Sequence, residues 1–124
     1  MASGMVKQVS PMLAVRDVKE SIAFYNELFG FTVVVESPDY AVISRDGQSL
    51  HLMASASEEI TRIVSQHTEI YIEVDDLQAF WARVQTHSGK YRVREPFDRK
   101  YGMTEFHIDD GNCLIFVGEM TKKP

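Results

Sequence analysis

The sequence predicts an α+β fold made of two consecutive β-α-β-β-β modules, and three observations support this prediction. Each half of the chain places an Asp before an apolar stripe of helical spacing, at Asp17 and at Asp76. Within each half the apolar period changes from two residues to 3.6 and back to two, as it does in a strand-helix-strand order. An Asp-Gly turn precedes the last strand of both halves, at Asp46-Gly47 and Asp110-Gly111.

The first half contains one predicted helix between four predicted strands. Asp17 is a plausible N-cap, and Gly30 stands where helices commonly end. The helix between them has its apolar stripe at Val18, Ile22, Tyr25 and Phe29. The Asp-Gly pair is a hairpin turn signal between the last two strands. We expect strands at residues 10–15, 31–36, 40–44 and 49–53.

The second half repeats this order after a polar linker, residues 55–67, for which we expect one helical turn. We expect a strand at 69–74, a helix at 76–87 and strands near 91–95, 103–108 and 113–118. Trp81 falls on the helical stripe with Leu77, Phe80 and Val84, so we expect it to pack in the core. We expect a single domain over residues 5–120, with module one at 8–54 and module two at 68–119.

Composition narrows the class of partner. The 124 residues carry a formal net charge of −5 and a single cysteine, Cys113, which excludes an intrachain disulfide and a thiol zinc site. The longest apolar run, Cys113 to Val117, has five residues and is far short of a membrane span of about 20. The basic segment 90–100 is interrupted by acidic residues, which favours a solvated strand edge. We expect a cytoplasmic protein without a nucleic-acid or membrane partner.

Two stretches carry a resemblance to a known family. They are Val15-x-Asp17-x-x-x-Ser21-Ile22-x-Phe24-Tyr25-x-x-x-x-Gly30-Phe31 and Tyr101-Gly102-x-x-Glu105-Phe106…Asp110-Gly111-Asn112. With the tandem modules, they resemble the vicinal oxygen chelate superfamily of glyoxalases, dioxygenases and bleomycin-resistance proteins. The second stretch is most similar to the bleomycin-resistance branch, although Asp109-Asp110-Gly111-Asn112 lacks that branch's proline. The resemblance implies one curved, cup-shaped mixed sheet with a helix behind each half, completed by a second copy in a homodimer.

The resemblance also implies where a metal would bind. Metal-dependent members hold a divalent ion on the concave face of the cup, and the corresponding positions here are Ser10, His51, Glu69 and Ile115. Only His51 and Glu69 have side chains that bind metals well, whereas catalytic sites normally use three protein ligands. We therefore expect no metal cofactor. His107, one strand away, remains a candidate third ligand, so a metal-dependent lyase or dioxygenase of the glyoxalase class stays the alternative.

Strand alternation then predicts which side chains line the cup. Together with the walls that the resemblance implies, we expect Met12, His51, Met53, Glu69, Tyr71, Tyr101, Phe106 and Ile115 to bind a ligand. In the last strand we expect Cys113, Ile115 and Val117 to face the cup, and Leu114 and Phe116 to face the helix. His51 and Glu69 could form an ion pair or act together on a ligand.

The function that these residues favour is sequestration of a hydrophobic or cationic small molecule, as in bleomycin-type antibiotic resistance. An unneutralised Glu69 would favour the cation. The sequence identifies no catalytic residue, and we expect binding without turnover. A lyase-like or isomerase reaction that uses Glu69 as the base remains open.

Overall fold

The computed structural model describes residues 4–87 and 89–121. Its elements follow the predicted order twice, with a helix between the two halves. They are β1 (Met12–Val15), α1 (Val18–Phe29), β2 (Thr32–Ser37), β3 (Tyr40–Arg45), β4 (Gln48–Ala54), α2 (Glu58–Ser65), β5 (Glu69–Glu73), α3 (Leu77–Val84), a 3-10 turn (Gln85–His87), β6 (Arg92–Asp98), β7 (Met103–Asp109) and β8 (Leu114–Met120).

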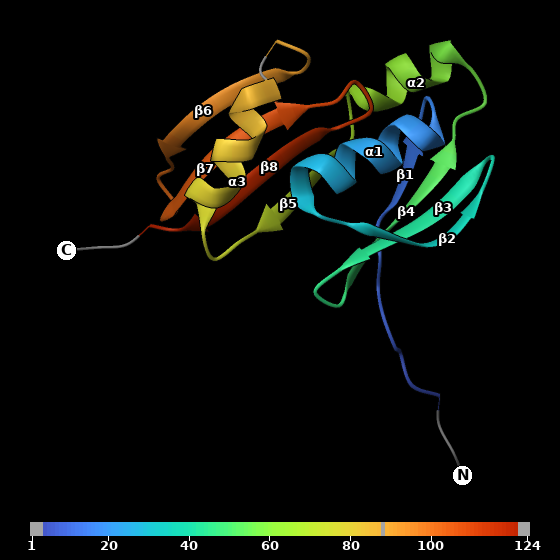
Figure 1. Ribbon diagram of the computed structural model, residues 1–124, viewed down its shortest axis with the longest axis horizontal. Helices are drawn as coiled ribbons and strands as arrows, with labels where there is room; N and C mark the ends of the chain where they lie inside the picture. The colour runs from blue at the N-terminus through green and yellow to red at the C-terminus, as the bar shows by residue number, and fades with distance from the viewer. Residues whose placement is uncertain (1–3, 88, 122–124) are drawn as a thin grey trace.

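The strands form two four-stranded mixed sheets of the same topology (Figure 1). The strand order is β1-β4-β3-β2 in the first sheet and β5-β8-β7-β6 in the second, with one parallel pair in each. α1 and α3 lie on the same side of the molecule and each covers one sheet. We call the face turned away from the helices the open face of each sheet. The α+β class and the tandem modules are confirmed.

Hydrogen bonding divides the strands into two sheets, whereas we expected one curved sheet. In the described part of the chain, β1 and β5 are edge strands that do not pair with each other. Within each module the first strand pairs in parallel with the last strand, so the inner strands have a neighbour on both sides. The backbone groups of these inner strands therefore need no hydrogen bond to the other module. Two edges, β1 and β5, are thereby left unpaired within the chain.

Local sequence explains where the helices and the first hairpin form. The Asp17 side chain accepts a hydrogen bond from the backbone N–H of Glu20, and Gly30 ends α1 at a φ of 73°. Asp76 caps α3 in the same way. At the β3–β4 turn, Asp46 and Gly47 both have positive φ, as a type I′ hairpin requires. The predicted caps and turn are confirmed.

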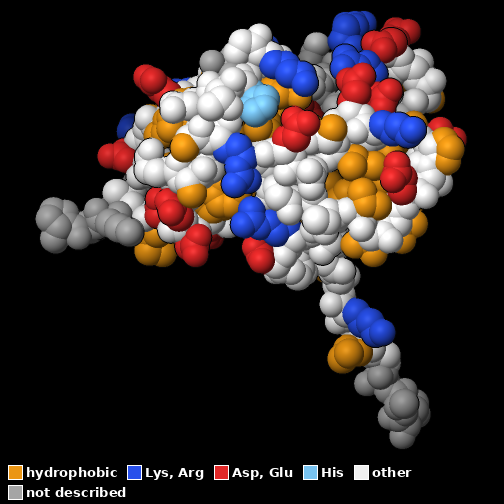
Figure 2. Space-filling view, viewed as in Figure 1, with side chains coloured by type: hydrophobic (Ala, Val, Ile, Leu, Met, Phe, Trp, Pro, Cys, Tyr) orange, Lys and Arg blue, Asp and Glu red, His pale blue; other side chains and the backbone are white. Residues whose placement is uncertain are grey.

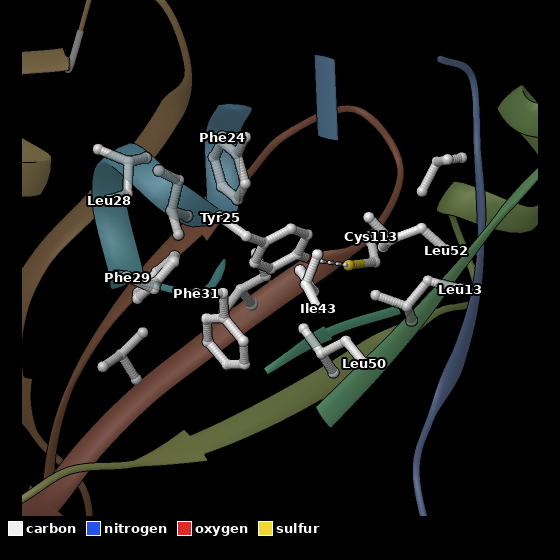
Figure 3. Close-up of a cluster of buried hydrophobic side chains, with 14 of the residues drawn as sticks. Leu13, Phe24, Tyr25, Leu28, Phe29, Phe31, Ile43, Leu50, Leu52 and Cys113 are labelled. Atoms are coloured by element: carbon white, nitrogen blue, oxygen red, sulfur yellow. Dashed lines mark hydrogen bonds between the residues drawn. The ribbon is translucent and has the colours of Figure 1, made fainter. Parts of the chain in front are cut away.

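The core lies between the helices and the sheets and joins the two modules (Figure 3). The Tyr25 hydroxyl on α1 lies 3.8 Å from the thiol of Cys113, just before β8. Phe29 stacks on Phe80 of α3, with ring centroids 6.1 Å apart. Trp81 packs its ring against Phe106 of β7, as its place on the helical stripe predicted. Both helices therefore bury their apolar stripes in one shared cluster.

Three predicted elements differ in extent. The linker contains α2, a helix of eight residues rather than one turn, which begins at the N-cap Ser57. β1 begins at Met12, two residues late, because Ser10 and Pro11 precede the paired register. β6 continues to Asp98 through a bulge between Arg94 and Phe97. The bulge carries the strand past Pro96, which has no N–H for a regular ladder.

The predicted orientation of β8 is wrong, and so is that of Phe106. Ile115 and Val117 are fully buried on the helix-facing side with Phe106, and Cys113 is buried in the same cluster. Phe116 instead lies in register with Tyr71 and His107 on the open face, and Leu114 shares its parity. Alternation could not decide this, because β8 is a central strand with apolar residues on both faces.

No helix among residues 4–87 and 89–121 has the length and apolar character needed to cross a membrane.

Candidate functional site

Three rows of side chains cross the open face of the second sheet. The strand register aligns them from β5 through β8 and β7 to β6. The middle row is Tyr71, Phe116, His107 and Arg94. The flanking rows are Glu69, Leu114, Asp109 and Arg92 on one side, and Glu73, Gly118, Glu105 and Phe97 on the other. This face combines aromatic rings with charged groups, and no helix covers it.

Glu105 is the centre of the face. Its side chain is fully buried, yet it accepts hydrogen bonds from four neighbouring groups. The Tyr71 hydroxyl donates to Oε2 over 2.9 Å, and the Tyr101 hydroxyl donates to the same oxygen. Arg99 Nη1 and His107 Nε2 each lie 3.1 Å from Oε1. A buried carboxylate needs this many partners because unpaired charge is costly inside a protein.

These partners keep Glu105 ionised and the tyrosines protonated. Burial alone would raise the pKa of Glu105, but hydrogen bonds from Tyr101, His107 and Tyr71, with the charge of Arg99, hold it below its ordinary value. Burial and the hydrogen bond to Glu105 raise the pKa of Tyr71. The hydrogen bond to the same carboxylate is the main cause of the raised pKa of Tyr101. Both hydroxyls are therefore fixed donors at neutral pH.

Two local features bring these groups to Glu105. A tight turn after β6, in which Gly102 has a φ of 88°, folds Arg99 and Tyr101 back over β7. Gly118 lies beside Glu105 on β8 and leaves space for the Tyr71 side chain. A Cβ at position 118 would stand 2.0 Å from the Tyr71 oxygen, so the hydrogen bond between Tyr71 and Glu105 requires glycine there.

The rings form a continuous belt across the sheet. Tyr71 stacks on Phe116 with centroids 6.3 Å apart, and Phe116 contacts His107 at 4.2 Å. His107 contacts Phe97 at 5.2 Å, and the Arg94 guanidinium lies 3.6 Å from the Phe97 centroid. Side chains that contact each other in this way are held in place before a ligand arrives, which lowers the entropic cost of binding.

The open face of the first sheet is simpler and mostly apolar. Met12 and Met53 are exposed, and His51 lies opposite Met12 in the strand register, two residues before Met53 on β4. The Tyr40 hydroxyl and His51 Nδ1 share a hydrogen bond. Ser10 is bonded to the hydroxyl of Ser49, 2.6 Å away. This face has one imidazole and no carboxylate among the residues in register with His51.

The structure brings together only some of the predicted site residues. Tyr71 and Tyr101 meet at Glu105, and Glu69 lies on the same sheet face. His51 shares a hydrogen bond with Tyr40, and among the described residues no ion pair joins it to Glu69. Phe106 and Ile115 point into the core instead of lining the open face.

A metal does not fit the donor set of one chain. Among the described residues, no three His, Cys, Asp or Glu side chains come close enough to hold an ion. His107 is hydrogen-bonded to Glu105, and both oxygens of that carboxylate already accept hydrogen bonds from other side chains. Ile115 points into the core. We therefore derive no chemical step through a metal.

A cleft of about 900 Å³ lies between α1, α2, the start of β6 and the β7–β8 turn, and it shares Arg92, Asp109 and Leu114 with one end of the open face of the second sheet. None of the predicted site residues lines it. Figure 2 shows the helix-covered side of the molecule, where Lys, Arg, Asp and Glu side chains are scattered among hydrophobic ones. The concentration of aromatic and hydrogen-bonded groups is on the open face of the second sheet, which makes that face the candidate site.

Sequence reasoning missed Glu105, Phe116, Phe97 and Arg94 as site residues. The sequence could have indicated Glu105, because it precedes the apolar Phe106 in a predicted strand and belongs to the Tyr101-Gly102-x-x-Glu105-Phe106 motif. Phe116 was assigned to the wrong face. Arg94 and Phe97 are three residues apart and share a face only because of the bulge. Pro96, which stands between them, is the sequence signal that could have indicated this bulge.

Solved structures share this fold across nearly the whole chain at low identity. A bleomycin resistance determinant encoded on transposon Tn5 has 22% identity and a TM-score of 0.75, over 93% of this chain and 98% of that one. A bleomycin-binding protein from Streptomyces verticillus, complexed with copper(II)-bleomycin, has 24% identity and a TM-score of 0.69, over 96% and 100%. A lactoylglutathione lyase from Agrobacterium tumefaciens has 18% identity and a TM-score of 0.69, over 93% and 95%.

No curated protein matches the chain significantly by sequence. One family model matches residues 7–114, which is most of both modules. The protein is a member of the glyoxalase/bleomycin resistance protein/dioxygenase superfamily.

Proposed function

We propose that this protein sequesters a hydrophobic or cationic small molecule without a metal, in a cup that a second copy of the chain completes. The observation that carries the proposal is the aromatic belt on the open face of the second sheet, held by the buried Glu105. Structural relatives that are bleomycin-binding proteins support the same kind of role.

The belt suits a planar ligand. Tyr71 and Tyr101 expose about half of their surface, 44% and 57%, while their hydroxyls are fixed by Glu105. An exposed ring with a fixed orientation offers apolar contact at little entropic cost. Covering about 300 Å² of apolar ligand surface would contribute about 7 kcal/mol before the cost of association, which corresponds to micromolar binding at best.

The cationic part of the proposal depends on the edge of the sheet at β5. Glu69 and Glu73 flank Tyr71 on the same face and are exposed. Neither carboxylate has an ion-pair partner within the described ranges, so both can meet a positive group on a ligand beside Tyr71. His51 would face that ligand from the first sheet of the second copy.

The exposed sheet faces and unpaired strand edges support the proposed dimer. Met12, Met53 and Tyr71 expose apolar area on sheet faces, and β1 and β5 present unpaired edges. Apolar sheet faces and open edges usually bind a partner. Sedimentation equilibrium tests this step: we expect a mass of about twice 14.1 kDa at micromolar concentration. A monomer at all concentrations would contradict it.

The binding proposal is tested by calorimetric titration with two probes, bleomycin and the planar cation acridine orange. We expect at least one to bind with micromolar affinity and to be recovered unchanged. Tyr71→Ala should weaken binding about fivefold, because an aromatic pair contributes about 1 kcal/mol beyond area burial. Ile63→Ala on α2, which also removes an exposed apolar side chain, is the matched control and should leave affinity unchanged. No binding of either probe, or equal loss in both variants, would contradict the proposal.

Within residues 4–87 and 89–121 of one chain, no group of three metal-binding side chains supports the metal-dependent alternative. Metal analysis of protein purified without chelator tests it against the metal-free proposal. One tightly bound divalent ion per chain, lost in His51→Ala, would replace sequestration with metal chemistry.

A further inference from the structure

The charges on the open face of the second sheet are arranged with opposite signs at its two edges. Glu69 and Glu73 stand on the β5 edge, and Arg92 and Arg94 stand on the β6 edge. Between them, Glu105 is matched by Arg99 at 3.1 Å. Arg99 therefore offsets the charge of Glu105, and Asp109 is a second carboxylate within the face, opposite Arg92 in the register. The other charges lie at the ends of the rows.

Arg94 is the cation at the end of the aromatic row. Asp109 lies directly opposite Arg92 in the strand register, whereas the residue opposite Arg94 is His107. Arg94 is exposed and has no ion-pair partner among residues 4–87 and 89–121. The Cζ atom of its guanidinium lies 3.6 Å from the Phe97 ring centroid, so a cation–π contact positions the group.

The bulge in β6 is what places this guanidinium. Arg94 and Phe97 are three residues apart, so in a regular strand they would point to opposite faces. At the bulge, two residues of β6 lie opposite one residue of β7, so the Phe97 side chain lies on the open face with Arg94. Bulges commonly re-aim a side chain in this way, and here the result is a fixed, unpaired cation at the end of the belt.

From this arrangement we propose that the ligand is a planar molecule with an acidic group, and that Arg94 binds that group. The proposal rests on the proposed function, because it specifies the ligand of the same face. The row from Tyr71 to Arg94 spans three strand spacings, or about 14 Å. A ligand that covers the belt would thus reach the guanidinium with a carboxylate, sulfonate or phosphate at its far end. Guanidinium binds such groups through paired hydrogen bonds.

Two matched fluorescent probes test the proposal: 1-pyrenesulfonate, and 1-pyrenemethanol, which has the same ring system without the charge. Affinity for each is measured at low salt with the wild-type chain, Arg94→Gln and Arg92→Gln. We expect the sulfonate to bind about tenfold more tightly than the alcohol to the wild-type chain, as for a hydrogen bond to a charged group. Arg94→Gln should abolish that difference, so that this variant binds the sulfonate no more tightly than it binds the alcohol. Arg92→Gln should preserve the difference.

The outcomes separate this proposal from the one on which it rests. Equal affinity for both probes, or a preference for the sulfonate that persists in Arg94→Gln, would overturn the assignment of Arg94 and leave planar-ligand binding standing. Binding of neither probe would overturn both proposals. Loss of the preference in both arginine variants would show general attraction to the basic edge and would also overturn the assignment.

Discussion

Gly118→Ala is the substitution that most sharply tests the arrangement around Glu105. A Cβ at this position would lie 2.0 Å from the Tyr71 oxygen, 2.9 Å from its Cζ and 3.1 Å from Glu105 Cγ. Real Cβ contacts are never this short, so something must move. The Tyr71 side chain is the group that can move, because the clash is with its far end and the residue is 44% exposed.

The expected loss of stability comes from the hydrogen bond that Tyr71 gives up when it moves. Moving it breaks the 2.9 Å hydrogen bond from Tyr71 to the buried Glu105. Removing a hydrogen bond to a charged group costs about 1.5–3 kcal/mol, and the methyl's contact with Glu105 Cγ adds little if that side chain shifts by a few tenths of an ångström. We expect Gly118→Ala to lower the free energy of unfolding by about 2 kcal/mol. For a chain of this length that corresponds to a fall in Tm of about 6–8 °C.

The assay is urea unfolding at pH 7, followed by circular dichroism, in two backgrounds. In a Tyr71→Leu background the obstructing hydroxyl and ring are absent, so Gly118→Ala should cost less than about 0.5 kcal/mol there. Gly89→Ala, whose added Cβ would meet no atom within 4 Å, is the control and should be nearly neutral. A neutral Gly118→Ala in the wild-type chain, or the same cost in both backgrounds, would refute the reasoning about this contact.

Three further predictions concern single side chains. The pKa of Glu105 is lowered in the folded chain, so its contribution to stability is present above the ordinary pKa of 4.5 and is lost as the pH falls through the lowered pKa. Glu105→Gln should therefore be less stable than the wild-type chain at pH 7, and its stability should fall less between pH 7 and pH 3. Urea unfolding across this pH range measures both effects. Burial raises the pKa of Cys113 from 9.0 to about 12, so stability should fall by about 1.4 kcal/mol per pH unit between these values, and Cys113→Ala should remove that part of the alkaline loss. An unchanged alkaline slope would argue against burial of the thiol. Asp17→Ala removes the N-cap of α1 and should cost about 1 kcal/mol in thermal unfolding, with Asp39→Ala in the β2–β3 turn as a surface control expected to cost less.

The fold could be predicted from local sequence because its signals are local. Asp17, Gly30 and Asp46-Gly47 each determine a cap or turn through their own backbone preferences, and the structure confirms them. Because the two halves of the sequence share the same landmarks, the elements of the second module could be predicted from those of the first. What local signals could not supply was the division into two sheets, since no local pattern specifies which strand lies beside β1 or β5.

The site was harder to predict because it depends on parity and on long-range contacts. A central strand such as β8 is apolar on both faces, so Phe116 and Ile115 could be exchanged without violating the pattern. The correct reading required Gly118, whose missing side chain makes room for a tyrosine from β5. Strand alternation placed Tyr71 on the open face and the family resemblance singled out Tyr101, but only the three-dimensional contacts show that both hydroxyls donate to Glu105.

Amide chemical shifts measured during titration with 1-pyrenesulfonate would locate the ligand on the molecule. If ligands bind on the open face of the second sheet, the largest changes will fall on β5, β7 and β8 around Tyr71, Phe116 and His107, with Arg94 at their edge. Changes confined to α1, α2 and the β7–β8 turn, around the 900 Å³ cleft, would contradict binding on that face.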